Sequence, residues 1–182
     1  PSFEAEEVKI FGEMYKKGYI YKGKKPVYWC YTDETALAEA EIEYQDDPCT
    51  TIFVKFPIKD DLGKLGQYCD LSKLFFVIWT TTPWTLPGNR AICLNAAYDY
   101  VLMQVPSGEV YIVAEGLSEA VCKAAGIESH TVLATLKGSA FERMTAQHPL
   151  LENVESVVLN GDHVTLDAGS GCVHTAPGFG AD

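Results

Sequence analysis

The sequence predicts an α+β fold, in which a barrel-like or strongly curved β-sheet carries peripheral helices. Short runs of β-branched and aromatic residues recur along the chain, separated by Gly, Pro and Asn-Gly turn signals. Apolar residues fall at helical spacing mainly in residues 4–17 and 115–125. The sequence contains no Gly-rich dinucleotide loop and no phosphate-binding P-loop pattern. Many short strands with few helices are typical of a barrel or a curved sheet.

The N-terminal part combines a helix with less regular elements. The first helix is expected to end at Gly18, and residues 27–31 are expected to form a short strand. Residues 35–38 predict a turn of helix capped by Asp33. Acidic and apolar residues alternate over residues 39–44, which predicts a half-exposed strand.

The remaining chain is rich in predicted strands. They are expected at residues 50–56, 74–80, 90–94, 99–105, 109–114, 132–136, 156–159 and 172–175. Pro57 is expected to end the first of these strands. Asn160-Gly161 is a strong turn signal, after which residues 163–166 are expected to continue as a strand.

The length of 182 residues suits a single domain with a sizeable core. We expect residues of about 1–45 to lead into a β-rich core of about 46–182. The chain has no initiator Met and no signal-peptide pattern, and it stops abruptly at Ala181-Asp182, so we interpret it as a fragment of a larger protein. Its longest apolar run, residues 74–79, is too short to span a bilayer.

Charge and cysteine usage narrow the classes of function. A formal net charge of -11 opposes broad binding to a phosphate backbone, although it permits contact with a short single-stranded end. The lysines between Lys16 and Lys25 are interpreted as solvated surface, with contact to RNA as the minority interpretation. The six cysteines form no C-x-x-C pair, so neither a zinc site nor a disulfide framework is expected. We expect most of them to be buried small side chains.

A threonine-rich loop is the first candidate site. A buried strand ends in consecutive threonines, and Pro83 and Pro87 must then break the ladder and stiffen the loop. Its polar groups come from Thr80, Thr81, Thr82, Trp84, Thr85 and Asn89. Hydroxyls that both donate and accept hydrogen bonds suit a polar substrate and a water molecule. Because threonine is also common in strands, the residues alone leave a functional and a structural interpretation about even.

A second candidate segment lies near the C-terminus. Residues 167–171 form a Gly-rich turn, which allows backbone to approach a ligand closely. The short strand that follows carries His174, a group that titrates near neutral pH, and ends before Pro177. A lone histidine is usually structural, so its interpretation depends on its neighbours.

Both segments resemble peptides of the editing domain (connective peptide 1) of isoleucyl-tRNA synthetases. The string from Trp79 to Pro87, followed by Asn89, is similar to the family's threonine-rich peptide, whereas valyl and leucyl relatives carry TTRP there. The string from Gly169 to Gly180 resembles G-T/S-G-x-V-H-T-A-P-x-H/F-G, which faces the threonine loop across the pocket in this family. Valyl and leucyl relatives lack its histidine.

The resemblance covers nearly the whole chain and is least distinctive over residues 115–165. Residues 25–30 and 35–41 resemble the segment that leads into the domain, and the continuation over 88–92 looks bacterial. Many bacterial members have a second Cys where this chain has Asp33, so no metal is assumed.

The resemblance implies a barrel-like editing fold and an aminoacyl-tRNA deacylase. It would hydrolyse the ester of mischarged Val-tRNA(Ile), and also valyl-adenylate, while excluding Ile by size. The implied catalytic residues are Thr80, Thr81, Thr82 and His174. The implied substrate-binding residues are Trp84, Thr85, Asn89, Thr175 and Asp182. The family ends this peptide in two Asp residues, of which the second binds the α-amino group; Asp182 matches the first.

The implied partners are the 3′ end of tRNA(Ile) carrying Val, valine or valyl-adenylate as a small ligand, and the rest of the synthetase in cis. Editing itself requires no cofactor, because ATP and Mg would belong to the synthetic domain. The location implied is cytoplasmic, without a membrane.

Three alternatives remain open at this point. The first is a valyl- or leucyl-type editing domain with another amino-acid specificity, against which Thr82, Trp84 and His174 argue. The second is a non-catalytic module that binds the tRNA 3′ end. The third is a generic β-rich binder of small molecules.

Overall fold

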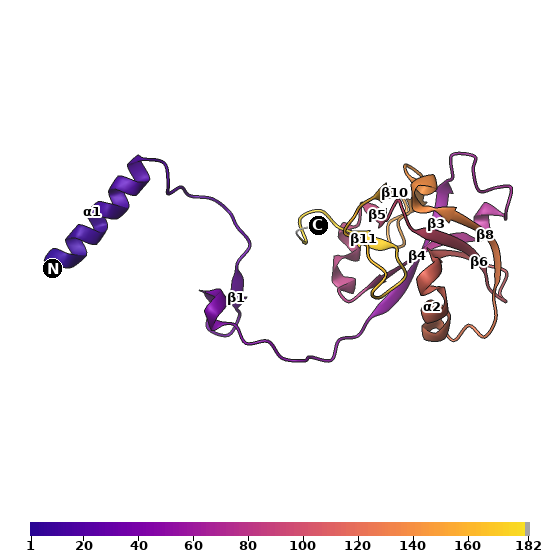
Figure 1. The fold of residues 1–182 in the computed structure, drawn as a ribbon, viewed down its shortest axis with the longest axis horizontal. Coiled ribbons are helices and arrows are strands. Elements are labelled where there is room, and N and C mark those ends of the chain that lie inside the picture. The colour runs from indigo at the N-terminus through magenta and orange to yellow at the C-terminus, as the bar shows by residue number, and fades with distance from the viewer. Residues whose placement is uncertain (181–182) are drawn as a thin grey trace. The chain divides into compact units, whose positions relative to one another are not determined.

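The structure is a computed structural model that describes residues 1–180, so the predicted substrate-binding residue Asp182 lies outside the described residues. Contacts divide the chain into two compact units, Pro1–Asp47 and Pro48–Asp182. Figure 1 shows the helix and hairpin of the first unit and the curved sheet of the second. Among the residues described, no helix has the length and apolar character needed to cross a membrane.

The first unit contains helix α1 (Ser2–Lys16) and a two-stranded antiparallel sheet of β1 (Tyr28–Cys30) and β2 (Thr35–Leu37). The predicted helical turn at 35–38 is therefore wrong, because these residues pair with β1 across a turn that contains Glu34 at φ 52°. Asp33 accepts a hydrogen bond from the Cys30 thiol instead of capping a helix.

The strand predicted at 39–44 is also wrong. A 3₁₀ helix spans Glu39–Glu41 instead. The Glu41 carboxylate accepts a hydrogen bond from the backbone N–H of Ala38 at 2.7 Å, which closes this short turn locally. The alternation of acidic and apolar residues reflects this turn rather than pairing with another strand.

The second unit is built on a nine-stranded sheet. Its strands are β3 (Ile52–Asp60), β4 (Leu74–Thr80), β5 (Ala91–Leu94), β6 (Asp99–Gln104), β7 (Val110–Ala114), β8 (Thr131–Lys137), β9 (Thr145–Gln147), β10 (Glu155–Asn160) and β11 (Val173–Thr175). Six of them close a barrel in the order β11-β5-β10-β9-β3-β4, because β11 also pairs with β4. Strands β7, β6 and β8 extend the sheet from β4. The predicted α+β, barrel-like fold is confirmed.

Strand β4 is the branch point that positions the site. Its first half, from Leu74 to Phe76, pairs in parallel with β7, and Trp79 pairs in parallel with Val173 of β11. The two strands therefore share one edge of β4 in succession. Residues that follow β4 consequently emerge beside β11, although the two strands are far apart in sequence.

Two predicted boundaries are corrected by the strand pairing. Strand β3 continues through Pro57 to Asp60, because Pro57 lies where β3 leaves β4 and begins to pair with β9. A residue without an N–H is tolerated at such a change of partner. Residues 163–166 form no strand, since the chain turns back locally with the N–H of Val164 donating to the Gly161 carbonyl at 3.3 Å.

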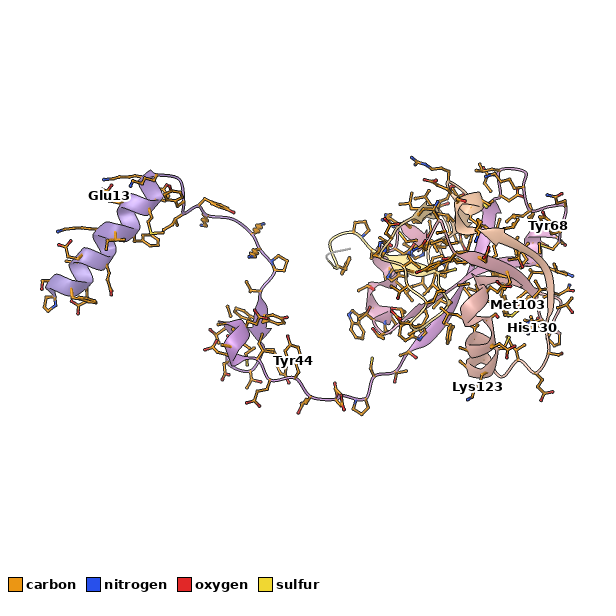
Figure 2. The ribbon with its side chains drawn as sticks, in the orientation of Figure 1. Glu13, Tyr44, Tyr68, Met103, Lys123 and His130 are labelled. Carbon is orange, nitrogen blue, oxygen red and sulfur yellow. The ribbon has the colours of Figure 1, made fainter. Side chains whose placement is uncertain are left out.

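The core and helix α2 of this unit follow the apolar pattern. Phe56, Phe76 and Ile78 are fully buried inside the barrel sheet. Helix α2 (Ser118–Ala125) follows a 3₁₀ turn at Glu115–Leu117, and its Cys122 thiol contacts the Met103 sulfur at 3.4 Å and His130 Nδ1 at 3.4 Å. Figure 2 labels Met103 and His130 beside this helix. Of the six cysteines, three are buried, and Cys49 is exposed.

Candidate functional site

Two adjoining cavities lie where β4 and β11 end. The larger cavity measures about 420 Å³ and is bounded by residues 79–82 on one side and by His163, Thr165 and residues 167–174 on the other. The smaller cavity measures about 180 Å³ and is lined by Thr82, Thr85, Val173, His174, Thr175, Ala176, Phe179 and Gly180. Thr82, Val173 and His174 line both cavities, so these residues form the boundary between them.

The threonine loop is ordered by its own hydroxyl groups. Thr80 ends β4, and its Oγ1 accepts a hydrogen bond from the backbone N–H of Thr82 at 3.0 Å. A 3₁₀ helix then spans Pro83–Gly88, in which the Thr85 hydroxyl donates to the Thr82 carbonyl at 2.8 Å. The loop is therefore a compact turn, a feature that the two prolines alone did not predict.

His174 joins the two candidate segments. Its Nε2 lies 2.9 Å from Thr85 Oγ1, and its Nδ1 lies 2.7 Å from Asn89 Nδ2. Both ring nitrogens are therefore engaged by residues of the threonine segment. The predicted proximity of the two segments is present in the structure, with the imidazole at the contact.

The hydrogen bonds around Asn89 assign the His174 tautomer. Asn89 is fully buried, its Nδ2 donates to the Ala91 carbonyl at 3.0 Å, and its Oδ1 accepts from the Ser156 hydroxyl. These partners fix the orientation of the amide, so Nδ2 must also donate to His174 Nδ1. His174 consequently carries its proton on Nε2 and donates it to Thr85 Oγ1, whose own proton goes to the Thr82 carbonyl.

These hydrogen bonds and the burial of the ring favour the neutral form of His174. Burial lowers the pKa of His174 below its ordinary value of 6.5, and the nearby His148 adds to the shift. A proton on Nδ1 would also face the N–H group of Asn89. With Nδ1 accepting from Asn89 and Nε2 donating to Thr85, neither ring nitrogen of His174 has a free lone pair in this arrangement. Its geometry suits a rigid wall between the two cavities.

We expect the stability of the protein to depend on this group in mild acid. Because the folded pKa of His174 lies below its unfolded value of about 6.5, unfolding takes up a proton as the pH falls through that value. The stability contributed by neutral His174 is therefore complete above this pH and is lost as the pH falls below it. Urea unfolding measured across this range should show the fall, and His174→Gln should flatten it; an unchanged slope in that variant would contradict the assignment.

The Gly-rich segment forms the opposite wall of the larger cavity. Gly169 and Gly171 have φ values of 82° and 76°, which L side chains rarely adopt. The Ser170 carbonyl accepts a hydrogen bond from the N–H of Ala114 at 2.8 Å, and the Gly171 carbonyl accepts one from the Tyr100 hydroxyl at 2.7 Å. The wall is thus fastened to β7 and β6 before it enters β11.

The predicted site residues occupy different positions. Thr80, Thr81 and Thr82 line the larger cavity, and Thr85 and Thr175 line the smaller one. Asn89 lines neither cavity and instead holds His174. Trp84 is 72% exposed and lines neither cavity, because the 3₁₀ turn directs it away from them.

Several lining residues were not singled out from the sequence. His163, Thr165 and Asp167 line the larger cavity, and Phe179 lines the smaller one. His148 also supports the site, since its Nε2 lies 2.9 Å from the Leu86 carbonyl while its Nδ1 accepts the N–H of Leu150. Asp167 and Phe179 lie within the second candidate segment, whereas His163 and Thr165 lie outside both segments. The described residues contain no cluster of three His, Cys, Asp or Glu able to hold a metal ion.

Comparison with known proteins gives concordant matches. Residues 1–156 match the family described as tRNA synthetases class I (I, L, M and V). The chain is 56% identical to the isoleucine--tRNA ligase of Caldanaerobacter subterraneus subsp. tengcongensis, over 100% of this chain and 19% of that protein. It is 54% identical to the corresponding ligase of Lactobacillus acidophilus, over 99% of this chain and 19% of the ligase. The chain thus spans about a fifth of the length of these relatives.

Two solved structures share the fold. The crystal structure of GlLeuRS-CP1 gives a TM-score of 0.57 at 21% identity, covering 69% of this chain and 52% of that one. The editing domain of the P. knowlesi cytosolic leucyl-tRNA synthetase gives a TM-score of 0.55 at 14% identity, covering 70% of this chain and 59% of that one. At these identities the likeness concerns the fold alone.

Proposed function

Since the chain belongs to the class I tRNA synthetases, as an isoleucyl-type segment with an editing-domain fold, we propose that it hydrolyses mischarged Val-tRNA(Ile) and valyl-adenylate. The observation that carries the proposal is the pair of cavities that meet at Thr82 and His174. One chamber of about 180 Å³ suits a small side chain, and one of about 420 Å³ suits the terminal nucleoside. The scissile ester would then lie at their boundary.

A second pocket of this kind answers a physical limit on discrimination. One methylene in an apolar pocket contributes only about 1–3 kcal/mol, and the discrimination of isoleucine from valine by isoleucyl enzymes is subject to that limit. A pocket that admits the smaller product and hydrolyses it removes the error by size. The sieve is steric, so it requires walls that do not yield.

The site supplies positioning rather than a strong base. Thr81 and Thr82 line the larger cavity, and their hydroxyls would orient the ester and an attacking water. Thr80 holds the backbone of Thr82, and His174 fixes the turn through Thr85. Because His174 has no free acceptor nitrogen, its role in this proposal is to bound the side-chain chamber.

Deacylation tests the proposal directly. A full-length isoleucine--tRNA ligase carrying this segment should clear Val-tRNA(Ile) and should leave Thr-tRNA(Val) largely intact. The double variant Thr81→Ala and Thr82→Ala should slow clearance by about 10²-fold, because it removes groups that orient the reacting atoms. Unchanged clearance in this variant would sink the site assignment, and preferential clearance of Thr-tRNA(Val) would favour the valyl-type alternative.

Binding of tRNA by the chain itself is expected to be weak and only slightly dependent on salt. The net charge of -11 leaves little basic surface to displace counterions from a phosphate backbone. The domain would receive only the 3′ end, while the rest of the synthetase, acting in cis in the cytoplasm with ATP and Mg, would hold the tRNA body. Filter binding at two salt concentrations measures the affinity of the chain for tRNA and its dependence on salt. Tight, salt-sensitive binding would contradict the prediction.

A further inference from the structure

Phe179 is an exposed aromatic residue that also lines a cavity and lies close to Gly88. Its side chain is 64% exposed, yet it lines the smaller cavity. A Cβ atom placed on Gly88 would lie 2.7 Å from Phe179 Cε2 and 3.2 Å from Cδ2. The ring therefore occupies the space that a side chain at position 88 would need.

The glycine at position 88 is explained by this ring rather than by its own backbone. Its φ lies outside the left-handed range that favours glycine, so an L side chain would fit the backbone. An L side chain at position 88 would instead overlap the ring of Phe179. Gly88 ends the 3₁₀ helix that carries Thr85, so the contact joins the far end of that helix to the segment after β11.

The local turn after β11 directs the ring back to Gly88. The N–H of Phe179 donates to the Ala176 carbonyl at 3.1 Å, and Gly178 within the turn has φ 85°. The turn reverses the chain after Pro177. The Phe179 ring then bridges the two segments that form the walls of the smaller cavity.

We propose that Phe179, seated on Gly88, is the wall that sets the size limit of the smaller cavity and so excludes the isoleucine side chain. The other groups lining this cavity are short, except for His174, which is held at both nitrogens. Among the residues of 1–180 that line this cavity, Phe179 is the one large apolar side chain that a branched aliphatic group would meet. This inference rests on the proposed deacylase function and names the specificity-determining residue within it.

The proposal is tested by measuring whether a variant gains hydrolysis of correctly charged Ile-tRNA(Ile). In a full-length ligase carrying this segment, Phe179→Ala should raise hydrolysis of correctly charged Ile-tRNA(Ile) by roughly 10–200-fold, the range that one methylene commands. Clearance of Val-tRNA(Ile) should continue. Gly88→Ala should produce the same gain while keeping the phenylalanine, because its Cβ displaces the ring. A merely destabilised protein would lose both activities and gain neither.

Two controls isolate the ring. Phe179→Tyr keeps the aromatic ring, adds only a hydroxyl, and should leave Ile-tRNA(Ile) intact. Leu150→Ala removes another apolar side chain of similar exposure, 60%, which lies outside the smaller cavity, and should change neither activity.

The inference and the proposed function fail in different ways. If the unsubstituted protein does not clear Val-tRNA(Ile), the proposed function is wrong. If it does, and Phe179→Ala leaves Ile-tRNA(Ile) uncleaved, the size-limiting role of Phe179 is wrong. Binding of non-hydrolysable valyl- and isoleucyl-adenosine analogues gives a readout without catalysis, in which Phe179→Ala should narrow the preference for the valyl analogue. An unchanged preference would overturn the inference.

Discussion

Replacing Gly171 by alanine is expected to destabilise the protein by about 2–5 kcal/mol and to disrupt the candidate site. Gly171 has φ 76°, a conformation that costs an alanine roughly 1–2 kcal/mol. The new Cβ would also lie 2.4 Å from the Cβ of Ala114, and such overpacking costs about 1–3 kcal/mol. This repulsion would push the wall of the larger cavity away from β7. Urea denaturation measures the loss of stability.

Gly63→Ala is the matched control for the backbone term. Gly63 has φ 71°, but nothing lies within 4 Å of a Cβ placed there. It should therefore cost only about 1–2 kcal/mol. Equal losses in the two variants would show that the contact with Ala114 is relieved without cost, contrary to expectation.

Replacing Asn89 by alanine is the second change with a large expected effect. The amide is fully buried and serves Ala91, Ser156 and His174 at once. Its removal takes a hydrogen-bond partner from the Ala91 carbonyl, the Ser156 hydroxyl and His174 Nδ1, which is expected to cost about 2–4 kcal/mol. The imidazole would also lose the contact that fixes its tautomer, so clearance of Val-tRNA(Ile) should fall with stability.

Asn89→Asp separates the two roles of the amide. A carboxylate next to Nδ1 favours a protonated ring, so the pKa of His174 should rise above its depressed value in the unsubstituted protein. NMR titration of the His174 ring protons measures the shift. A titration identical to that of the unsubstituted protein would contradict the hydrogen-bond assignment. Thr85→Val leaves the Asn89 contact intact and removes only an acceptor for the Nε2 proton, so it should not raise the pKa of His174.

The local patterns in the sequence were sufficient for most elements. The apolar run 74–79 is strand β4, and the helix predicted over 4–17 is α1. In these cases the periodicity and the turn residues lie within the element itself. Two predictions failed where strand pairing decides the conformation, for β2, which pairs with β1, and for Pro57, where β3 changes partner. Two others, at residues 39–44 and 163–166, failed because the chain forms a local turn there.

The sequence also predicted which residue types form the site, but it did not predict their individual roles. The two recognised strings contain Thr82, Thr85 and His174, and the resemblance placed them on facing walls. Trp84 belongs to the same string and is nevertheless exposed outside both cavities. Composition and order cannot state which way a side chain points when a loop coils into a 3₁₀ turn.

The sequence by itself determined the fold class, the family and the peptides from which the cavities are built, because each is encoded in short contiguous patterns. Only the tertiary structure decided that Thr85 and His174, 89 positions apart, share a hydrogen bond. It also decided that the ring of Phe179 packs against Gly88. Closing the barrel through β11 and β4 brings those segments together. The tautomer of His174 then follows from a buried amide whose orientation is set by Ala91 in β5 and Ser156 in β10.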